Sequence, residues 1–498
     1  MVTGWQKSLL FLCAILTPAM SAVSPTLAAE DDRLKIGLVL AGGGARGGAH
    51  IGVLKTLEEN RIPVDYIAGT SFGAIVGALY ASGYSAEELD RTLHELDWAK
   101  LLSDSAPRTH RSMQRKRDDQ DASIEMEIGY KNGEFLLPTG LVRGNQLRLT
   151  LSQLMGRANR VTHFDQLPIP FRAVAADLLT GDEVILEDGN LASAVLASMS
   201  VPGLFPPFER GDQLLVDGGI VNNLPINVAR SMGADIVIVV DIGAPPATRE
   251  ELTSFTKVLR QMIALLTRKS RQAQLETLKD TDILIKPDTL GISLTDFTKT
   301  SDTVPQGKAA AKAKLKSLLP YQLDETSWQH HLLSRKVEAH TETVEFIRIN
   351  NTSRIADTFI EKNVRLNVGD KIDQKALAED LTKIYGTGDF ESIDYQVITE
   401  NDQTGIEITA QNRRIGNDYL RFGVSLEDDF SGTSKYSLNA IYTKRGINDL
   451  GAEWRNKFVL GNNLRVETEF YQPLDDRQKF FSFAGGTLLR TTRGLVDD

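Results

Sequence analysis

The chain has 498 residues, a length typical of roughly three to four folding units rather than one. Hydrophobic residues make up 41% and charged residues 24% of it, a composition that allows a sizeable buried core. The net charge of −10 leaves no basic footprint, which excludes nucleic acid as an expected partner.

Residues 1–29 have the pattern of a secretory signal peptide rather than of a folded segment. Lys7 supplies a positive n-region, and Leu9–Leu16 is an apolar run too short to span a bilayer. Small residues near Ala22 or Ala28–Ala29 offer cleavage sites. A membrane anchor is the weaker alternative because the apolar run is short and broken by a proline. We therefore predict export.

The only cysteine of the chain, Cys13, lies within that apolar run. No small residues precede it, which argues against a lipoprotein. After cleavage the mature protein contains no thiol, and hence neither a disulfide nor thiol catalysis. A cysteine-free protein suits an oxidising exported compartment.

Residues 30–320 alternate strand and helix signals. Apolar runs predict buried strands at Leu34–Ala41, Val64–Gly69, Phe171–Ala176, Gln213–Val216 and Ile236–Asp241. Helical stretches follow the first two strands, one around Ile51–Asn60 and one that ends near Gly83. Ser85 then opens another helix, with Glu88 completing a capping box. This alternation predicts a three-layer α/β/α sandwich around a mostly parallel sheet.

A glycine-rich turn at the end of the first strand opens the first helix. Gly42, Gly43 and Gly44 have no side chains, so their N–H groups are free to point at a substrate oxygen as an oxyanion hole. The competing interpretation is a dinucleotide site, because Gly42, Gly44 and Gly47 satisfy G-x-G-x-x-G after a strand. Asp65, however, precedes the second strand, whereas a ribose-binding acid belongs at that strand's carboxyl end. We rank the dinucleotide site second.

The second strand leads directly into Gly69, Ser71 and Gly73, which form a Gly-x-Ser-x-Gly motif followed by a helix. A serine on such a sharp strand-to-helix turn projects its hydroxyl away from the backbone. The flanking glycines remove Cβ atoms that would clash, and the helix N-terminus favours developing negative charge. The motif recurs by chance, but its strand–turn–helix context favours a nucleophilic Ser71.

A basic stretch lies between these motifs and the next strand. It contains Arg108, Arg111, Arg115, Lys116 and Arg117, and acidic residues follow it at 118, 119 and 121. Such a stretch attracts anionic lipid headgroups in some proteins. We favour the alternative here, a solvated loop whose charges balance one another.

The proton acceptor for Ser71 is the next question. The later histidines are interpreted as surface residues, since none lies in a strand-end loop; they are His94, His110, His163, His330, His331 and His340. Asp217 follows the apolar run 214–216 and precedes Gly218 and Gly219, at the carboxyl end of a predicted strand, where open α/β sheets place their sites. A partly buried carboxylate there can accept the Ser71 proton. The alternative interpretation is that Asp217, followed by two glycines, only forms a turn.

These motifs, in this order, resemble the patatin-like phospholipase family over about Leu34–Pro320, including the segments Leu137–Leu141 and Ala197–Gly203. The resemblance implies a Ser71–Asp217 dyad without histidine, an oxyanion hole at Gly42–Gly44, and cleavage of fatty acyl esters through an acyl-enzyme. It implies no metal and no organic cofactor, and the sequence shows no metal-ligand cluster. Arg46 then holds the glycine loop or orients the oxyanion. The supporting residues are Arg46, Gly69, Gly73, Gly218 and Gly219.

The residue composition and the pattern of predicted elements change after residue 320. Residues 321–341 are polar and are interpreted as a linker. Residues 342–413 carry a strand, two helices and two strands, and this β-α-α-β-β order resembles a POTRA domain. The POTRA-like unit is expected in the periplasm.

Residues 418–498 alternate apolar and polar side chains with a period of two, in segments of about ten residues. A transmembrane β-barrel and a soluble antiparallel sheet both fit this pattern. About five strands fit before Asp498, fewer than the eight of the smallest barrels, so we expect a C-terminally truncated barrel. These strands resemble the start of an outer-membrane surface-antigen barrel, which favours the membrane interpretation.

The whole arrangement resembles the type Vd autotransporters. It implies a secreted lipid acyl hydrolase of phospholipase A or lysophospholipase type, at the cell surface or released, anchored in the outer membrane by its barrel. Its substrate is a phospholipid or another fatty acyl ester at a membrane lipid surface. None of these motifs predicts an oligomeric state. The alternative function is an outer-membrane translocation or assembly module with a catalytically passive patatin passenger.

Overall fold

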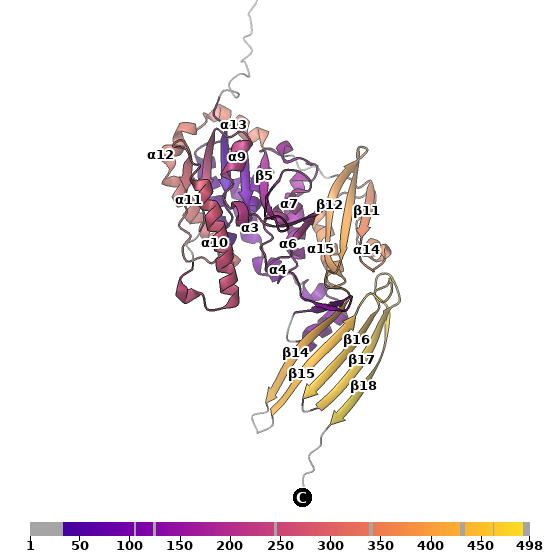
Figure 1. Cartoon of the computed structure of the whole chain (residues 1–498). Helices are drawn as coiled ribbons and strands as arrows, with labels where there is room; N and C mark the ends of the chain where they lie inside the picture. The colour runs from indigo at the N-terminus through magenta and orange to yellow at the C-terminus, as the bar shows by residue number, and fades with distance from the viewer. Residues whose placement is uncertain are drawn as a thin grey trace, which may run out of the picture. The chain divides into compact units, whose positions relative to one another are not determined.

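The computed structural model describes residues 33–103, 106–122, 126–243, 247–337, 342–428, 434–461 and 463–491 (Figure 1). The predicted signal peptide, Cys13 and His340 lie outside these residues, as do the final residues 492–498. From Lys35 onward the chain forms one unit, and all contacts given below lie within it.

The first region is built on an eight-stranded sheet. Its strands are β1 (Ile36–Leu40), β2 (Tyr66–Thr70), β5 (Phe171–Asp177), β6 (Glu183–Leu186), β7 (Phe208–Arg210), β8 (Gln213–Asp217), β9 (Ile236–Val240) and β10 (Ile283–Ile285). The order is β10-β9-β1-β2-β5-β8-β7, with β6 paired to β5. The strands from β10 to β5 are parallel, whereas β6, β7 and β8 run antiparallel to their neighbours. All five predicted strands are present.

Helices cover both faces of this sheet, as predicted. The helices closest to it are α1 (Gly48–Glu59), α2 (Phe72–Ala81), α7 (Leu191–Ser198), α8 (Gly219–Asn222) and α9 (Ile226–Ser231). A Cβ at Gly37 in β1 would meet Ala229 of α9, while Leu40 of the same strand lies beside Gly77 of α2. Successive strand residues at odd and even positions face opposite ways, so α2 and α9 lie on opposite faces.

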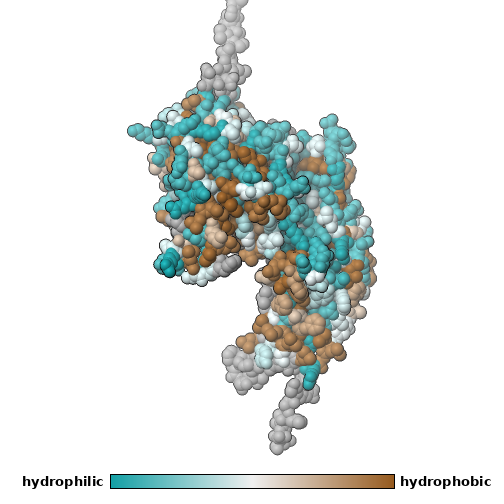
Figure 2. Space-filling view, in the orientation of Figure 1, coloured by the Kyte–Doolittle hydropathy of each residue, from teal (hydrophilic) through white to brown (hydrophobic). Residues whose placement is uncertain are grey.

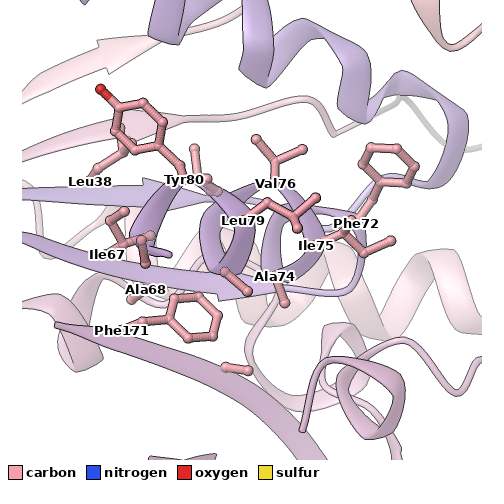
Figure 3. Packing of buried hydrophobic residues seen from close by; sticks show 14 of the residues in the cluster. Leu38, Ile67, Ala68, Phe72, Ala74, Ile75, Val76, Leu79, Tyr80 and Phe171 are labelled. Carbon is pink, nitrogen blue, oxygen red and sulfur yellow. The ribbon is translucent and has the colours of Figure 1, made fainter. Parts of the chain in front are cut away.

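Helix α2 is buried along its whole length, with none of its ten residues exposed. Its side chains Ile75, Val76 and Leu79 contribute to the core that also contains Leu38 and Phe171 (Figure 3). A helix that is apolar all round belongs inside a protein. The start of this helix, immediately after Ser71, is therefore held by packing as well as by hydrogen bonds.

The stretch 321–341, interpreted above as a linker, contains helix α13 (Glu325–Ser334). Asp324 caps it by accepting the Ser327 N–H, and Trp328 and His331 are buried and stacked on each other. The interpretation of His331 as a surface residue was therefore wrong. The sequence of α13 mixes polar and apolar residues without a clear period, so it does not predict that His331 packs against Trp328.

The small unit that follows has the predicted element order. It comprises β11 (Phe346–Asn351), α14 (Asp357–Asn363), α15 (Gln374–Tyr385), β12 (Phe390–Glu400) and β13 (Gln403–Asn412). The sheet order is β11-β13-β12, with β11 parallel and β12 antiparallel to β13. A separate core cluster lies between this sheet and its two helices.

The last region is an antiparallel meander of five described strands, the number expected. They are β14 (Asp418–Asp428), β15 (Ser434–Lys444), β16 (Glu453–Gly461), β17 (Asn463–Pro473) and β18 (Phe481–Thr491). One face is apolar and exposed; it includes Phe422, Val424, Leu438, Phe458 and Leu460. A short hairpin, β3 (Ile128–Lys131) and β4 (Glu134–Leu136), extends the sheet beside β14. Among the described residues no helix is both long and apolar enough to cross a membrane.

The basic stretch near residue 115 is not a solvated loop, contrary to our expectation. Its second half forms helix α5 (Met113–Asp121), where Arg115 and Asp118 are buried. Arg115 pairs with Asp118 and with Glu453 of β16, and Arg455 lies 3.0 Å from Asp118. The charges balance one another, as expected, but they do so in a buried network with partners more than 330 residues away.

Candidate active site

Ser71 lies at the junction of β2 and α2 in a strained backbone conformation. Its φ is 55° and its ψ is −124°, values that few non-glycine residues adopt. Its N–H donates to the Ser198 hydroxyl at 2.9 Å, and this hydroxyl in turn donates to the Val174 carbonyl at 2.6 Å. Two hydrogen bonds thus hold the strained turn to β5. The first turn of α2 adds partial positive charge beside the hydroxyl.

Gly69 and Gly73 allow β2 and α2 to approach each other closely. A Cβ at Gly69 would lie 2.6 Å from the Gly73 carbonyl oxygen, and a Cβ at Gly73 would collide with the Leu40 carbonyl oxygen. Since these neighbours are backbone atoms, they cannot rotate away from a new Cβ as a flexible side chain could. Both flanking glycines of the motif are required by the packing of the turn.

Asp217 ends strand β8 beside the Ser71 turn, as predicted, but for a different reason. Strand β8 runs antiparallel to β5, with Asp217 opposite Ala175, whereas Thr70 pairs with Val174 on the other side of β5. Asp217 therefore reaches the level of Ser71 from the opposite direction. The argument from the carboxyl edge of a parallel sheet was wrong for this strand.

The Ser71 hydroxyl is hydrogen-bonded to the Asp217 carboxylate. The Gly219 N–H also donates to Asp217 Oδ1, at 2.7 Å. Burial raises the pKa of Asp217 to about 6, although both hydrogen bonds lower it. A carboxylate with this pKa is ionised at neutral pH yet basic enough to take a proton from a hydroxyl during a reaction. Gly218, just before Gly219, lets α8 start against the Val174 carbonyl.

The three glycines of the loop after β1 are not equivalent. The Gly42 N–H donates to the Asn223 carbonyl at 3.3 Å. Within the described chain the N–H groups of Gly43 and Gly44 have no backbone or side-chain acceptor. Gly44 has a φ of +53° and lies against the Leu294 carbonyl, so a side chain there has no space. Of the predicted oxyanion donors, Gly43 and Gly44 are the two that remain available.

Arg46 supports this loop rather than pointing at a free oxygen. Its Nε donates to the Ile292 carbonyl at 2.7 Å, and the Thr303 hydroxyl donates to the Arg46 carbonyl at 3.3 Å. Of the two roles considered for Arg46, the contacts match holding the loop. Burial also lowers the pKa of its guanidinium.

Three residues at the site were not predicted from the sequence. Asn223 Nδ2 donates to the Gly42 carbonyl at 3.1 Å, which ties the glycine loop to the chain after Asp217. His50 Nε2 lies 2.8 Å from the Ala41 carbonyl, and burial lowers the pKa of this histidine to about 4, so it is neutral. The third is Ser198. The Asn-Asn pair that follows Asp-Gly-Gly was the one sequence signal for Asn223.

The alternatives weighed for this region have different positions. Asp65 accepts the Ile36 N–H at 2.7 Å, at the start of β1 and β2, the sheet edge away from the glycine loop. No described histidine hydrogen-bonds to Ser71 or Asp217. In the part of the chain that the structure describes, no group of three or more His, Cys, Asp and Glu side chains is arranged to hold a metal ion.

Comparison with known proteins finds a family match over the region that contains this site. Residues 38–230 match the family model described as patatin-like phospholipase, and the matched range contains the glycine loop, Ser71 and Asp217. The chain therefore carries a patatin-like phospholipase domain. This match covers less than half of the chain.

Two curated relatives illustrate how far the similarity extends. The uncharacterized NTE family protein Rv2565 of Mycobacterium tuberculosis is 32% identical over 322 residues, 60% of this chain and 50% of that protein. Patatin-like phospholipase domain-containing protein 6 of Homo sapiens is 34% identical over 215 residues, 43% of this chain and 14% of the human protein. The chain spans half or less of the length of these relatives.

Among solved structures, VipD from Legionella pneumophila matches 58% of this chain and 67% of its own chain. The sequence identity is 17% and the TM-score is 0.34. A similarity this low does not by itself define a shared fold. The assignment of the domain rests on the family match and on the strand and helix order.

Proposed function

We propose that the patatin-like domain is a serine lipid acyl hydrolase of phospholipase A or lysophospholipase type. Ser71 is the nucleophile and Asp217 is the base. The Gly43 and Gly44 N–H groups donate hydrogen bonds to the oxyanion. One observation carries the proposal: a strained serine at a helix N-terminus is hydrogen-bonded to a buried carboxylate of raised pKa. The name of the matched family points to the same chemistry.

The first half of the reaction forms an acyl-enzyme. As Ser71 Oγ attacks the ester carbonyl carbon, its proton passes to Asp217, and the carbonyl oxygen becomes an oxyanion beside the glycine loop. The tetrahedral intermediate collapses, and the bond between the carbonyl carbon and the alcohol oxygen breaks. Asp217 returns the proton to the leaving alcohol, which departs as a lysolipid or another alcohol. The acyl group stays on Ser71.

The second half regenerates the enzyme. Water replaces the alcohol near Asp217, which accepts one of its protons as the water oxygen attacks the acyl-enzyme carbonyl. Collapse of the second tetrahedral intermediate breaks the bond to Ser71 Oγ, and the proton returns to Ser71. The product is a free fatty acid. No step requires a group beyond these residues and water.

The amide donors and the base make comparable contributions to the rate. A single oxyanion donor is worth about 3–4 kcal/mol of transition-state stabilisation, and general base catalysis contributes about 10²- to 10⁴-fold. Asp217 needs no histidine because it already contacts the hydroxyl. The turn also places Ser71 beside the glycine loop, since a Cβ built at Gly42 would lie 3.0 Å from Ser71 Cβ.

The test is hydrolysis of a short-chain fatty ester and of a defined phospholipid by the full chain. The proposal predicts that Ser71→Ala abolishes both activities and that Asp217→Asn lowers both by about 10³-fold or more. Ser231→Ala is the matched control, because it removes an exposed hydroxyl at the end of α9 that donates to the Val228 carbonyl of the same helix. Unchanged hydrolysis by the Ser71→Ala and Asp217→Asn variants would contradict the proposed Ser71–Asp217 dyad.

We also propose that the protein is exported and held in the outer membrane by its C-terminal strands. The signal-peptide pattern of residues 1–29 supports export. The exposed apolar face of β14–β18 supports a membrane-facing surface, because lipid-facing side chains alternate with inward polar ones in such strands. The POTRA-like unit would then lie in the periplasm. An inactive wild-type enzyme would favour the alternative, a translocation module with a passive passenger.

A further inference from the structure

Helix α10 (Phe255–Leu275) carries an apolar face that the described part of the chain leaves exposed. Val258, Met262, Leu265 and Leu266 are 44%, 58%, 48% and 49% exposed. These positions lie on one side of the helix, because neighbours on a helix face are three or four residues apart. Figure 2 shows hydrophobic side chains gathered on the surface where Figure 1 places α10.

The charge of the same helix has one sign. Its sequence contains five basic residues and no acidic one. Arg268 and Lys269 are exposed and continue the apolar face toward the helix C-terminus. An exposed apolar face beside basic side chains is typical of helices that lie on anionic membranes.

Other side chains of α10 contact the elements that carry the candidate site. The Ser270 hydroxyl donates to the Gly219 carbonyl and accepts the Asn223 N–H, both at 3.4 Å. Arg271 pairs with Asp241 at 2.8 Å, at the end of β9. One helix therefore connects the exposed apolar face to the chain that follows Asp217.

A second segment joins this surface. Leu259 of α10 is the nearest neighbour of Gly203, at 3.5 Å from the position of a Cβ there. The Leu141 N–H donates to the Gly203 carbonyl at 3.2 Å, and Leu141 is 79% exposed. The apolar surface thus continues from α10 to the segment at residue 141.

We propose that α10 is the element by which this domain docks on an anionic phospholipid bilayer. Its apolar face enters the headgroup boundary, and Arg268 and Lys269 contact the lipid phosphates. The inference rests on the proposed lipid hydrolase function and specifies its surface. A bilayer is the favoured occupant over a second copy of the chain, because two copies would bring together two helices of the same positive charge.

The first experiment measures docking without catalysis. The full chain carries Ser71→Ala, Cys13→Ser and Met262→Cys, labelled at residue 262 with a polarity-sensitive fluorophore. We expect its emission to shift to shorter wavelength on vesicles of phosphatidylcholine with phosphatidylglycerol, and to shift less in high salt. The same label on Lys312→Cys, exposed on α11 (Val304–Lys312), should not respond.

Two results of this experiment would overturn the proposal. One is an unchanged spectrum at residue 262 in the presence of anionic vesicles. The other is an equal shift without vesicles as the protein concentration rises, because it would mean that a second copy covers the face. Neither result depends on whether Ser71 is a nucleophile.

The second experiment compares two adjacent leucine pairs on helices. Leu265→Gln with Leu266→Gln alters α10, whereas Leu332→Gln with Leu333→Gln alters an exposed pair on α13, 37% and 66% exposed. We expect the α10 pair to lower phospholipid hydrolysis in anionic vesicles by about tenfold or more, with hydrolysis of a soluble short-chain ester unchanged. The α13 pair should leave both activities unchanged.

The outcomes separate the two proposals. An equal loss on vesicles and on the soluble ester would mean that α10 supports the site internally, which contradicts docking. No hydrolysis of any ester by the wild-type chain would contradict the hydrolase, while the fluorescence experiment would still decide the docking surface.

Discussion

At the scale of single residues, the most unusual feature is the backbone of Ser71. A serine at φ 55° and ψ −124° stores about 1–3 kcal/mol of strain, and this strain is held by α2 packing and by the Ser198 hydrogen bond. Glycine adopts this conformation without penalty. The strain therefore persists because the position needs a hydroxyl.

The strain at Ser71 should give two inactive variants different stabilities. Ser71→Gly should be more stable than Ser71→Ala by about 1 kcal/mol, because glycine relieves the strain but loses more backbone entropy on folding. Thermal unfolding of both variants at one pH measures the difference. A less stable Ser71→Gly would mean that the turn is not strained.

The raised pKa of Asp217 sets the pH dependence of the proposed reaction. The base must be ionised to accept the Ser71 proton, and burial raises its pKa to about 6. As pH falls through about 6 the carboxylate is protonated, so kcat/KM for a soluble ester should fall about tenfold per pH unit below that point. A profile that stays flat down to pH 4 would exclude a carboxylate with this pKa as the base.

Several site residues were predictable because their roles are local. Ser71 lies in a recognisable motif, and Gly42–Gly44 follow an obvious strand. Asn223 and Ser198 act through atoms of residues that are distant in sequence, and His50 acts through the carbonyl of Ala41, so their residue types alone do not predict these roles. Asp217 was found through its glycine neighbours.

At the scale of elements, α8 and the glycine loop are joined by Asn223. Its side-chain amide donates to the Gly42 carbonyl, and its carbonyl oxygen accepts the Gly42 N–H. These two bonds fix the loop whose next two N–H groups face no acceptor in the described chain. The loop is therefore positioned by the element that follows the base.

We expect Asn223→Ala to lower kcat by about tenfold to a hundredfold with little change in KM, because the loop loses its alignment for the oxyanion. Steady-state kinetics on a soluble ester measure both constants. Asn227→Ala is a matched control, since the Asn227 side chain accepts from Asn222 and donates to Glu183 rather than bonding to the loop. Equal effects of the two variants would contradict a role for Asn223 in positioning.

Helix α5 is joined to strand β16 by buried charges. Removing one member of a buried ion pair leaves its partner unpaired, so Arg115→Ala should destabilise the protein by about 3–5 kcal/mol. Arg348→Ala removes an exposed, solvent-screened pair with Glu400 and should leave the stability nearly unchanged. Denaturant unfolding compares the two. Equal losses would mean that the α5 network is not buried in solution.

The elements that the sequence predicted well are those buried on both faces. Strands β1, β2, β5 and β9 appear as largely apolar runs because nearly every residue in them is buried. The direction of β8 was not predictable, since a five-residue strand has the same pattern whichever way it runs. Helix α5 was missed because its buried charges look like a solvated face without their partners.

At the scale of the whole molecule, the proposed export determines where the hydrolase acts. The argument rests on residues 1–29, on the cysteine-free mature sequence and on the alternating strands at the C-terminal end. The α/β/α region, the β-α-α-β-β unit and the antiparallel strands were all anticipated, because each has its own hydrophobic period. The contacts between these regions were not, since a periodic pattern carries no information on partners.

Export makes a prediction about the N-terminus. The protein recovered outside the cytoplasm should begin after Ala22 or Ala29, because signal peptidase cleaves after small residues. Mass spectrometry of the N-terminal peptide measures this. Leu12→Arg places a charge in the apolar run and should keep the uncleaved chain inside the cell. Recovery of an exported chain that retains Met1 would contradict the signal peptide.

The central claim is that one serine and one aspartate cleave a fatty acyl ester. The most direct measurement is mass spectrometry of the full chain and its products after brief incubation with a defined phospholipid. We predict free fatty acid and lysolipid as products, a transient acyl group on the peptide that contains Ser71, and neither with Ser71→Ala. Fatty acid release by Ser71→Ala at the wild-type rate, or an acyl group on another residue, would contradict the account.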